Sequence, residues 1–319
     1  MNYRLFSPRR YSMCRKIFAQ PWEAHKTLTF DDRQARNDHA PFTLEFPENE
    51  TLTFTNNRAT RDFFDALFRR GPVIMPVIQE SKQLVFDWKG TKLGVRPQSD
   101  VLNFREVFLD DDYRLSRIRS PLKNVLDIGG NVGLFSLRAS EVADRITTFE
   151  PVSAQREVME RNLKRAGVLE KVEICPNAVS GNDGEKLRIY LSEHSTCASI
   201  SEASVEYNGE VQGYEDVETI SLAGIFERYE LERCDFLKCD IEGAEYPLFE
   251  AAPKETLEKV DRIAMEVHFS GPEFTLERFN AMKDKFSEAG LKIENQDPMN
   301  SEGKLKKIIL LYAHRNGWE

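Results

Sequence analysis

The stretch NVLDIGGNVGLFSLRAS, Asn124 to Ser140, places three glycines within five positions, between an apolar run and an amphipathic run. The apolar run is typical of a buried strand, and the run after the glycines has the spacing of an amphipathic helix. A glycine turn between the first strand and first helix of a parallel sheet lets a ligand approach closely, because glycine has no Cβ and the helix N-terminus presents free N–H groups. The stretch therefore predicts an α/β fold with a ligand site at this turn.

Short apolar segments alternate with amphipathic ones from Asn124 onward, which is typical of a parallel sheet covered by helices on both faces. The expected strands are 124–129, 145–151, 171–179, 235–243, 262–269, 291–297 and 305–314. The expected helices cover about 132–143, 153–166, 221–229, 245–259 and 274–289. Only a short polar connection separates the last two strands. We therefore expect a doubly wound, seven-stranded, mostly parallel sheet that ends in an antiparallel hairpin.

Three further elements are expected before the glycine stretch. The patterns predict a helix over 58–70, a β-hairpin over 82–97 and a helix within 99–115 that Asp100 caps. The residues expected to be buried by the two helices are Phe63, Phe64, Leu67 and Phe68, and Val101, Phe104, Val107 and Phe108.

The net charge of -9 and the pI near 5.3 argue against a nucleic-acid binder, because phosphate contacts require a surplus of Lys and Arg. The five cysteines lack metal-ligand spacing and are expected to be reduced thiols. With no export leader and no apolar run long enough to span a bilayer, the sequence predicts a cytoplasmic protein. The basic arm over residues 1–21 is expected to be solvated or packed between subunits of an oligomer, or to make peripheral contact with an anionic membrane surface.

Two common glycine motifs are excluded at the turn. The dinucleotide fingerprint requires glycine at positions 129, 131 and 134, where this chain has Gly129, Asn131 and Leu134, and the lysine of a phosphate loop is absent. What remains is D-x-G-G-N-x-G, followed by Glu150 at the end of the next strand, where an acid can accept hydrogen bonds from ribose hydroxyls. The expected ligand is an adenosine-type nucleoside without a pyrophosphate, a description that S-adenosylmethionine (SAM) fits.

Several ordered motifs resemble those of the FkbM-type SAM-dependent methyltransferases: NVLDIGGNVGLFSL, ITTFEPVSAQREVMERNLKRAG, PNAVSGNDGEKLRIYL and DFLKCDIEGAEYPLFEAA. The resemblance covers roughly residues 84–270 and implies a class I, Rossmann-like methyltransferase fold. It makes residues 84–319 the SAM-dependent methyltransferase domain, including its leading hairpin and helix. Residues 1–83 are then an N-terminal α+β extension with the basic arm and one helix.

The resemblance also implies the residues that bind SAM. They are Asp127, Gly129, Asn131 and Gly133 around the methionine and ribose, Glu150 at the ribose hydroxyls, and Asn177 and Ala178 beside the adenine. Gly130 stands where the family usually has alanine, and we expect it to give the turn more backbone freedom.

Methyl transfer is an in-line displacement that requires alignment and removal of the acceptor proton. If the expected strands over 235–243 and 262–269 are neighbours, their ends bring together Asp240, Glu242, Glu266 and His268. The candidate catalytic residues among them are Asp240, Glu266 and His268. In one mechanism His268 takes the acceptor proton while a carboxylate orients it; in the other the same residues bind a divalent cation such as Mg²⁺. The metal-free mechanism is preferred. Glu245 is expected to stabilise a helix N-terminus.

The leading hypothesis is a SAM-dependent O-methyltransferase acting on a hydroxyl of a sugar, a glycan or a secondary metabolite. One alternative keeps the donor but methylates a nitrogen or a protein. Another is a non-catalytic SAM- or nucleoside-binding module, which would have no use for a proton acceptor at Asp240 and His268. The expected partner is a small-molecule or glycan acceptor rather than a nucleic acid.

Overall fold

The computed structural model describes residues 100–192, 211–269 and 273–318 without interruption. Before residue 100 it describes 14, 15, 19, 20, 24, 42–45, 51–54, 60, 62–64, 66, 77–79 and 83–96. The chain forms two compact units, Met1–Asp110 and Asp111–Glu319. The expected hairpin and the helix that begins at Asp100 belong to the first unit. The domain boundary at 83/84 stays a prediction, and the compact units divide later in the chain.

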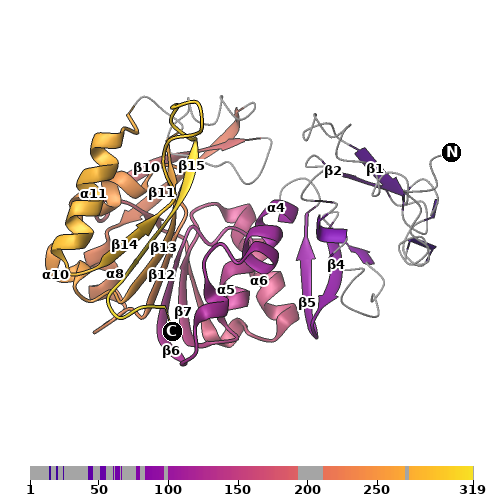
Figure 1. Cartoon of the computed structure of the whole chain (residues 1–319). Helices are drawn as coiled ribbons and strands as arrows, with labels where there is room; N and C mark the ends of the chain where they lie inside the picture. The colour runs from indigo at the N-terminus through magenta and orange to yellow at the C-terminus, as the bar shows by residue number, and fades with distance from the viewer. Residues whose placement is uncertain are drawn as a thin grey trace. The chain divides into compact units, whose positions relative to one another are not determined.

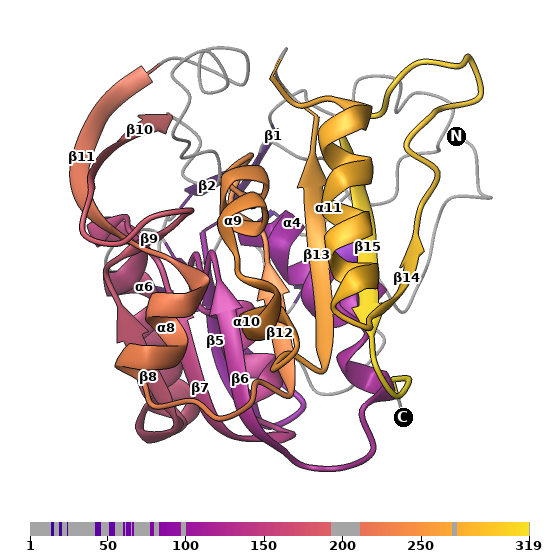
Figure 2. The same cartoon turned by 90° about the vertical axis from the view of Figure 1, so that its left-hand side faces the viewer.

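A seven-stranded sheet forms the centre of the second unit (Figures 1 and 2). Its strands are β6 (Leu122–Ile128), β7 (Ala143–Phe149), β8 (Val172–Cys175), β12 (Phe236–Cys239), β13 (Arg262–His268), β14 (Lys292–Asn295) and β15 (Ile308–His314). Their order is β14-β15-β13-β12-β6-β7-β8, and only β15 runs antiparallel to its neighbours. This arrangement confirms the expected class I methyltransferase fold with its antiparallel C-terminal hairpin.

Helices cover both faces of this sheet, as Figure 1 shows. On one face α5 (Leu134–Ala139) packs against α6 (Ser153–Ala166). The other face carries α8 (Leu222–Arg228), α9 (Glu245–Ala251), α10 (Lys254–Leu257) and α11 (Leu276–Glu288), which Figure 2 shows in front of the sheet. Buried side chains from β12, β13 and these helices form one continuous hydrophobic core. Close packing in this core therefore holds β12 and β13, and with them the residues at their ends.

Proline divides two elements that the sequence analysis expected to be continuous. The helix expected over 245–259 is two helices, because Pro253 forces Ala252 into an extended conformation with ψ 123°. The strand expected over 171–179 stops before Pro176 and resumes as β9 (Ala178–Val179). β9 leaves the large sheet and pairs in parallel with β11 (Val211–Ile220).

The second unit also contains a three-stranded sheet, one strand of which, β11, the sequence analysis did not predict. It has the order β10-β11-β9, with β10 (Lys186–Ser192) antiparallel to β11. The sequence analysis missed β11 because its run VQGYEDVETI contains a glycine and three acidic residues, which are unfavourable in strands.

The described part of the first unit has an aromatic core. Its strands are β1 (Phe42–Glu45), β2 (Thr51–Phe54), β3 (Val77–Gln79), β4 (Gln83–Trp88) and β5 (Thr91–Val95). The pairing of β4 with β5 confirms the expected hairpin. The helix α4 (Asp100–Phe104) continues as a π-helical segment, Arg105–Asp110. The ring of Phe63 packs edge to face on Phe86 and Phe104, with centroids 5.0 and 5.2 Å away.

Most of the described residues that were expected to be buried in the first unit are buried. Phe63, Phe64, Val101, Phe104 and Val107 are buried as expected, Phe108 is half-buried, and Leu67 and Phe68 lie outside the described residues. The Asp100 carboxylate is buried and accepts hydrogen bonds from the backbone N–H and guanidinium of Arg96.

The described helices include none with the length and apolar character needed to cross a membrane. The four described cysteines, Cys14, Cys175, Cys234 and Cys239, are buried and form no disulfide with one another.

Candidate functional site

The glycine turn, residues 129–133, connects the end of β6 to α5. The N–H of Gly129 donates to the carbonyl of Phe149 at the end of β7, at 3.0 Å. Gly129, Asn131 and Gly133 have positive φ angles of 83°, 46° and 81°, a region in which residues with a Cβ are uncommon. The turn therefore lies across the ends of two neighbouring strands in a conformation that favours glycine.

Close packing also requires glycine at this turn. A Cβ on Gly129 would lie 1.8 Å from the carbonyl oxygen of Asp240 at the end of β12. A Cβ on Gly130 would lie 2.1 Å from Oγ1 of Thr148, and the φ angle of Gly130 is not positive. Gly130 thus provides room for a neighbouring side chain, not the backbone freedom expected from the sequence.

The Asp127 side chain is fully buried next to the turn. Its Oδ2 accepts hydrogen bonds from Ser136 at 2.6 Å and Thr148 at 3.3 Å, and its Oδ1 lies 3.6 Å from Nζ of Lys238. Lys238 is itself buried and donates to the carbonyl of Gly129 at 2.5 Å. Protein groups therefore hold the Asp127 carboxylate beside the turn, while its Oδ1 has no hydrogen-bond partner among the described residues.

Glu150 follows directly after β7, next to the turn. Its carboxylate accepts hydrogen bonds from the backbone N–H groups of Asn131 at 2.8 Å and Val152 at 2.9 Å. Burial raises the pKa of Glu150 to about 7, although those N–H groups, Lys238 and Arg156 lower it. Oδ1 of Asn131 is buried and has no hydrogen-bond partner among the described residues. A ligand with hydroxyl or ammonium donors fits these acceptors, as SAM does.

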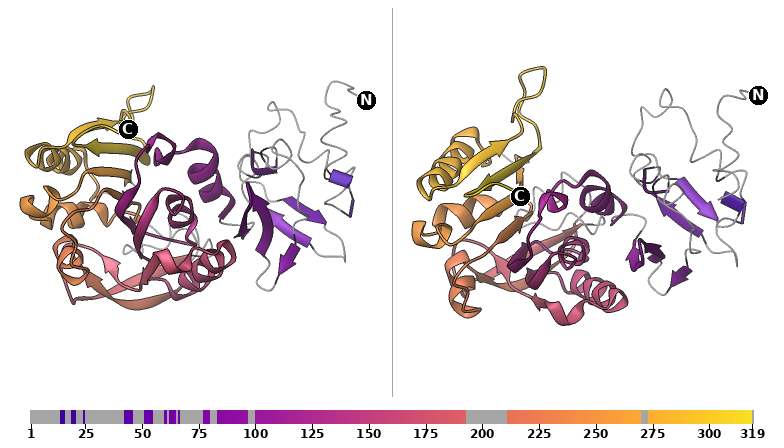
Figure 3. Two further views of the ribbon diagram at one scale, coloured as in Figure 1. Left: turned by 90° about the horizontal axis from the view of Figure 1, so that it is seen from below. Right: turned by 60° about the horizontal axis from the view of Figure 1, so that its bottom comes forward.

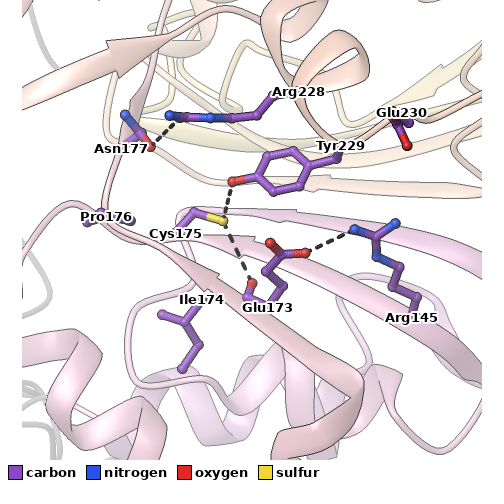
Figure 4. Close-up of a pocket in the computed structure, with 9 residues that line it drawn as sticks. All are labelled: Arg145, Glu173, Ile174, Cys175, Pro176, Asn177, Arg228, Tyr229 and Glu230. Carbon is purple, nitrogen blue, oxygen red and sulfur yellow. Dashed lines mark hydrogen bonds and ion pairs between the residues drawn. The ribbon is translucent and has the colours of Figure 1, made fainter.

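Asn177 and Ala178 follow β8, and the backbone N–H of Glu150 bonds to the carbonyl of Cys175 in that strand. The Asn177 amide donates to the carbonyl of Glu218 at 3.3 Å and accepts from Arg228 at 3.2 Å. Figure 4 shows Arg228 directed at Asn177 beside a cavity of about 560 Å³. Ala178 is buried at the start of β9. The Asn177 side chain is thus held by protein partners, and its place beside an adenine stays a prediction.

Asp240, Glu266 and His268 form what we call the strand-end cluster. The parallel pairing of β12 with β13 brings the ends of these strands side by side. One nitrogen or oxygen atom from each of the three side chains lies within 4.8 Å of the other two. Nε2 of His268 is 3.9 Å from Oδ1 of Asp240 and 3.5 Å from Oε2 of Glu242. The structure therefore brings together the three residues that the sequence analysis selected for catalysis.

Tyr113 joins this cluster from a distant part of the chain. Its hydroxyl donates to Oδ2 of Asp240 at 3.4 Å and lies 3.3 Å from Oε1 of Glu266, and the residue is buried. The sequence analysis missed Tyr113, because no local spacing relates it to β12 or β13. It did not include Lys238 among the candidate site residues, although Lys238 and Asp240 are alternate residues at the end of one strand.

Glu245, the first residue of α9, lies behind His268. Its Oε1 is 2.9 Å from Nδ1 of His268 and accepts a hydrogen bond from the backbone N–H of Ile241 at 3.1 Å. Glu245 is 0% exposed and His268 is 2% exposed. Besides lying at the helix N-terminus, Glu245 is therefore bound to a candidate catalytic side chain.

Burial and repulsion between negative charges raise the pKa of two carboxylates at this site, Glu242 and Glu266. Burial, with repulsion from Asp240, raises the pKa of Glu266 to about 8, and burial raises that of Glu242 to about 7. Burial alone would lower the pKa of His268, but the charges of Glu245, Glu242 and Asp240 raise it well above its ordinary value. Glu242 and Glu266 can therefore exchange protons close to neutral pH.

The strand-end cluster also has the donor set of a divalent-cation site, with two carboxylates and one imidazole. Proton transfer by His268 and cation binding are alternative uses of the same side chains, since an Nε2 bound to a metal cannot accept a proton.

A model of the "Methyltransferase FkbM domain" matches residues 127–293 of the chain. The AMB antimetabolite synthetase AmbE of Pseudomonas aeruginosa is 28% identical over 235 residues, which is 63% of this chain and 11% of AmbE. The methyltransferase sdnD of Sordaria araneosa is 28% identical over 190 residues, 51% of this chain and 73% of sdnD. The chain therefore spans only a small part of AmbE and most of sdnD.

Solved structures give more distant similarities. The methyltransferase FkbM from Methylobacillus flagellatus has a TM-score of 0.40 at 13% identity, over 62% of this chain and 46% of that one. SMU.1697c of Streptococcus mutans is described as a putative methyltransferase in complex with SAH. It has a TM-score of 0.42 at 10% identity, over 64% of this chain and 95% of that one.

Proposed function

Because this chain belongs to the FkbM family of methyltransferases, we propose that it transfers a methyl group from SAM to a hydroxyl of a sugar, a glycan or a secondary metabolite. The similarity to AmbE, an antimetabolite synthetase, supports an acceptor from specialised metabolism. The observation that carries the proposal is the placement of proton-accepting side chains beside the glycine turn. Lys238 connects the two, since it bonds to Gly129 and lies 3.7 Å from Asp240.

The donor site in this proposal is the glycine turn with Glu150. SAM supplies an electrophilic methyl group on a sulfonium centre. Glu150 accepts hydrogen bonds from the ribose hydroxyls, and its orientation is set by the N–H groups of Asn131 and Val152. Oδ1 of Asn131, which lacks a protein partner among the described residues, is available to a donor group of the same ligand.

The acceptor site in this proposal is the strand-end cluster. The Asp240 side chain is 22% exposed against 2% for His268, so Asp240 meets the acceptor hydroxyl before His268 does. The hydroxyl O–H bond breaks as the oxygen attacks the methyl carbon, and the proton passes to Nε2 of His268 and later to solvent. The C–S electron pair leaves with sulfur.

A hydroxyl acceptor suits this cluster better than an amine. An alcohol needs its proton removed as the new bond forms, whereas a neutral amine already offers a lone pair. A buried imidazole between carboxylates supplies the base that the alcohol requires.

A labelled-methyl assay tests this proposal. The full chain is incubated with SAM carrying a labelled methyl group and with panels of glycosides, hydroxylated metabolites, amines and peptides, and the products are analysed by mass spectrometry. We expect label on an oxygen of a glycoside or hydroxylated metabolite, and its loss in Asp240→Asn. Label only on nitrogen, or no label on any compound despite tight SAM binding, would contradict it.

A further inference from the structure

The imidazole of His268 has two chemically different environments at its two nitrogens. Nδ1 is 2.9 Å from Oε1 of Glu245, a normal hydrogen-bond distance. Among the described residues, the contacts of Nε2 are longer, 3.5 Å to Glu242 and 3.9 Å to Asp240. A carboxylate oxygen can only accept here, so in the neutral ring the proton is expected on Nδ1 and the lone pair on Nε2.

Glu245 has the burial expected of an orienting group. It lies inside the hydrophobic core with His268, and its Oε2 is buried without a hydrogen-bond partner among the described residues. Burying a carboxylate with an unsatisfied oxygen costs free energy. For holding the N–H of Ile241 alone, a neutral glutamine would serve as well. The carboxylate is therefore best explained by its charge acting on His268.

Resting on the proposed function, we propose that Glu245 is a positioning residue that fixes His268 in its Nδ1–H form and directs Nε2 toward the acceptor beside Asp240. The pairing corresponds to the orienting carboxylate of hydrolase triads, in which the acid holds the tautomer and stabilises the imidazolium without taking the proton. When Nε2 accepts the hydroxyl proton, the resulting cation faces the Glu245 carboxylate at Nδ1.

Other charged groups also act on His268. Asp240 and Glu242 face Nε2 from the end of β12 and the turn after it, and Glu266 lies on the same strand β13. Lys238 and the Tyr113 hydroxyl lie next to Oδ2 of Asp240, whereas Oδ1 of Asp240 is the atom near His268. In the described part of the chain Glu245 alone bonds to Nδ1, so removing its charge changes His268 without changing the groups that face Nε2.

Nitrogen NMR on the full chain tests this role without an identified acceptor. The protein is labelled with ¹⁵N in its histidine rings and saturated with S-adenosylhomocysteine, and the His268 signals are assigned by their absence in His268→Gln. At a pH above the raised pKa of His268, we expect its neutral ring to carry the proton on Nδ1. In Glu245→Gln we expect its apparent pKa to fall by about one unit, a tenfold change in proton affinity.

Glu255 provides the matched control, since it is an exposed acid in the first turn of α10. Glu255→Gln should leave the His268 signals unchanged, whereas Glu245→Ala should allow both tautomers. A wild-type His268 with its proton on Nε2, or an unchanged titration in a folded Glu245→Gln, would overturn the proposal. Failure of the O-methylation proposal would appear separately in the labelled-methyl assay.

Discussion

Nζ of Lys238 donates a 2.5 Å hydrogen bond to the carbonyl oxygen of Gly129, and this contact joins the glycine turn to the strand-end cluster. The same ammonium lies 3.6 Å from Asp127 and 3.7 Å from Asp240. Burial alone would lower the pKa of Lys238, but the charges of Asp240 and Asp127 raise it. One buried cation therefore balances a carboxylate in each half of the site.

Replacing Lys238 by methionine should destabilise the protein. Asp127 would become a buried carboxylate without a cation, and we expect the free energy of unfolding to fall by about 3 kcal/mol. Urea unfolding measures the change. Lys254→Met, in an exposed pair with Glu258 at 3.9 Å, is the control. A Lys238→Met variant no less stable than this control would contradict the account, and adding Asp127→Asn should recover part of the loss.

The close contact between Gly129 and the end of β12 predicts that a side chain at position 129 destabilises the protein. Gly129→Ala would place a Cβ 1.8 Å from the Asp240 carbonyl at a φ angle of 83°, so we expect a loss of about 2 kcal/mol or more of stability. The control is Gly213→Ala, since no atom lies within 4 Å of a Cβ at Gly213. Equal melting temperatures for the two variants would show that the turn tolerates a side chain.

Ionisation of Glu150 should make SAM binding depend on pH. Its pKa of about 7 means that the carboxylate needed for the ribose hydroxyls is increasingly protonated below neutral pH. We expect SAM affinity to fall up to about tenfold per pH unit below pH 7, and to be weak and nearly independent of pH in Glu150→Gln. Isothermal titration calorimetry at several pH values below and around 7 measures the SAM affinity. An affinity of the wild type that does not change with pH would count against Glu150 as the ribose ligand.

The same pKa shift has a consequence for folding. Because the folded pKa of Glu150 exceeds its ordinary value of 4.5, the protonated side chain favours the folded state at low pH. This contribution is present in full below about pH 4.5 and is lost as the pH rises through about 7.

Metal removal distinguishes the two uses of the strand-end cluster. Because His268 is proposed to act as a base, methyl transfer should be unchanged after EDTA treatment. Activity that is lost with EDTA and restored by Mg²⁺ would instead assign Asp240, Glu266 and His268 to a cation.

Local spacing was enough to predict the parts of the site that follow one another in sequence. Gly129 and Glu150 lie directly after the neighbouring strands β6 and β7. Asp240, Glu266 and His268 lie at the ends of β12 and β13, which the sequence pattern also located. The division at Pro253 was also accessible, since the residue before proline avoids helical geometry.

The remaining contacts depend on tertiary packing. Tyr113 reaches Asp240 from a segment before β6, and Glu245 reaches His268 from the next helix. The protein partners of Asp127 and Asn177 likewise come from other elements, Lys238 and Arg228. A motif assigns such residues to a ligand by position alone, whereas their partners within the protein appear only in the structure.

Isothermal titration of the wild type, Glu150→Ala and Asp240→Ala with SAM, S-adenosylhomocysteine and NAD tests the central claim most directly. We predict that the wild type binds SAM and S-adenosylhomocysteine but not NAD. Glu150→Ala should weaken SAM binding by about 10- to 100-fold, the value of hydrogen bonds to a charged group, while Asp240→Ala binds SAM as the wild type does. Binding of NAD without SAM, or equal loss of SAM binding in both variants, would contradict the assignment of separate donor and acceptor sites.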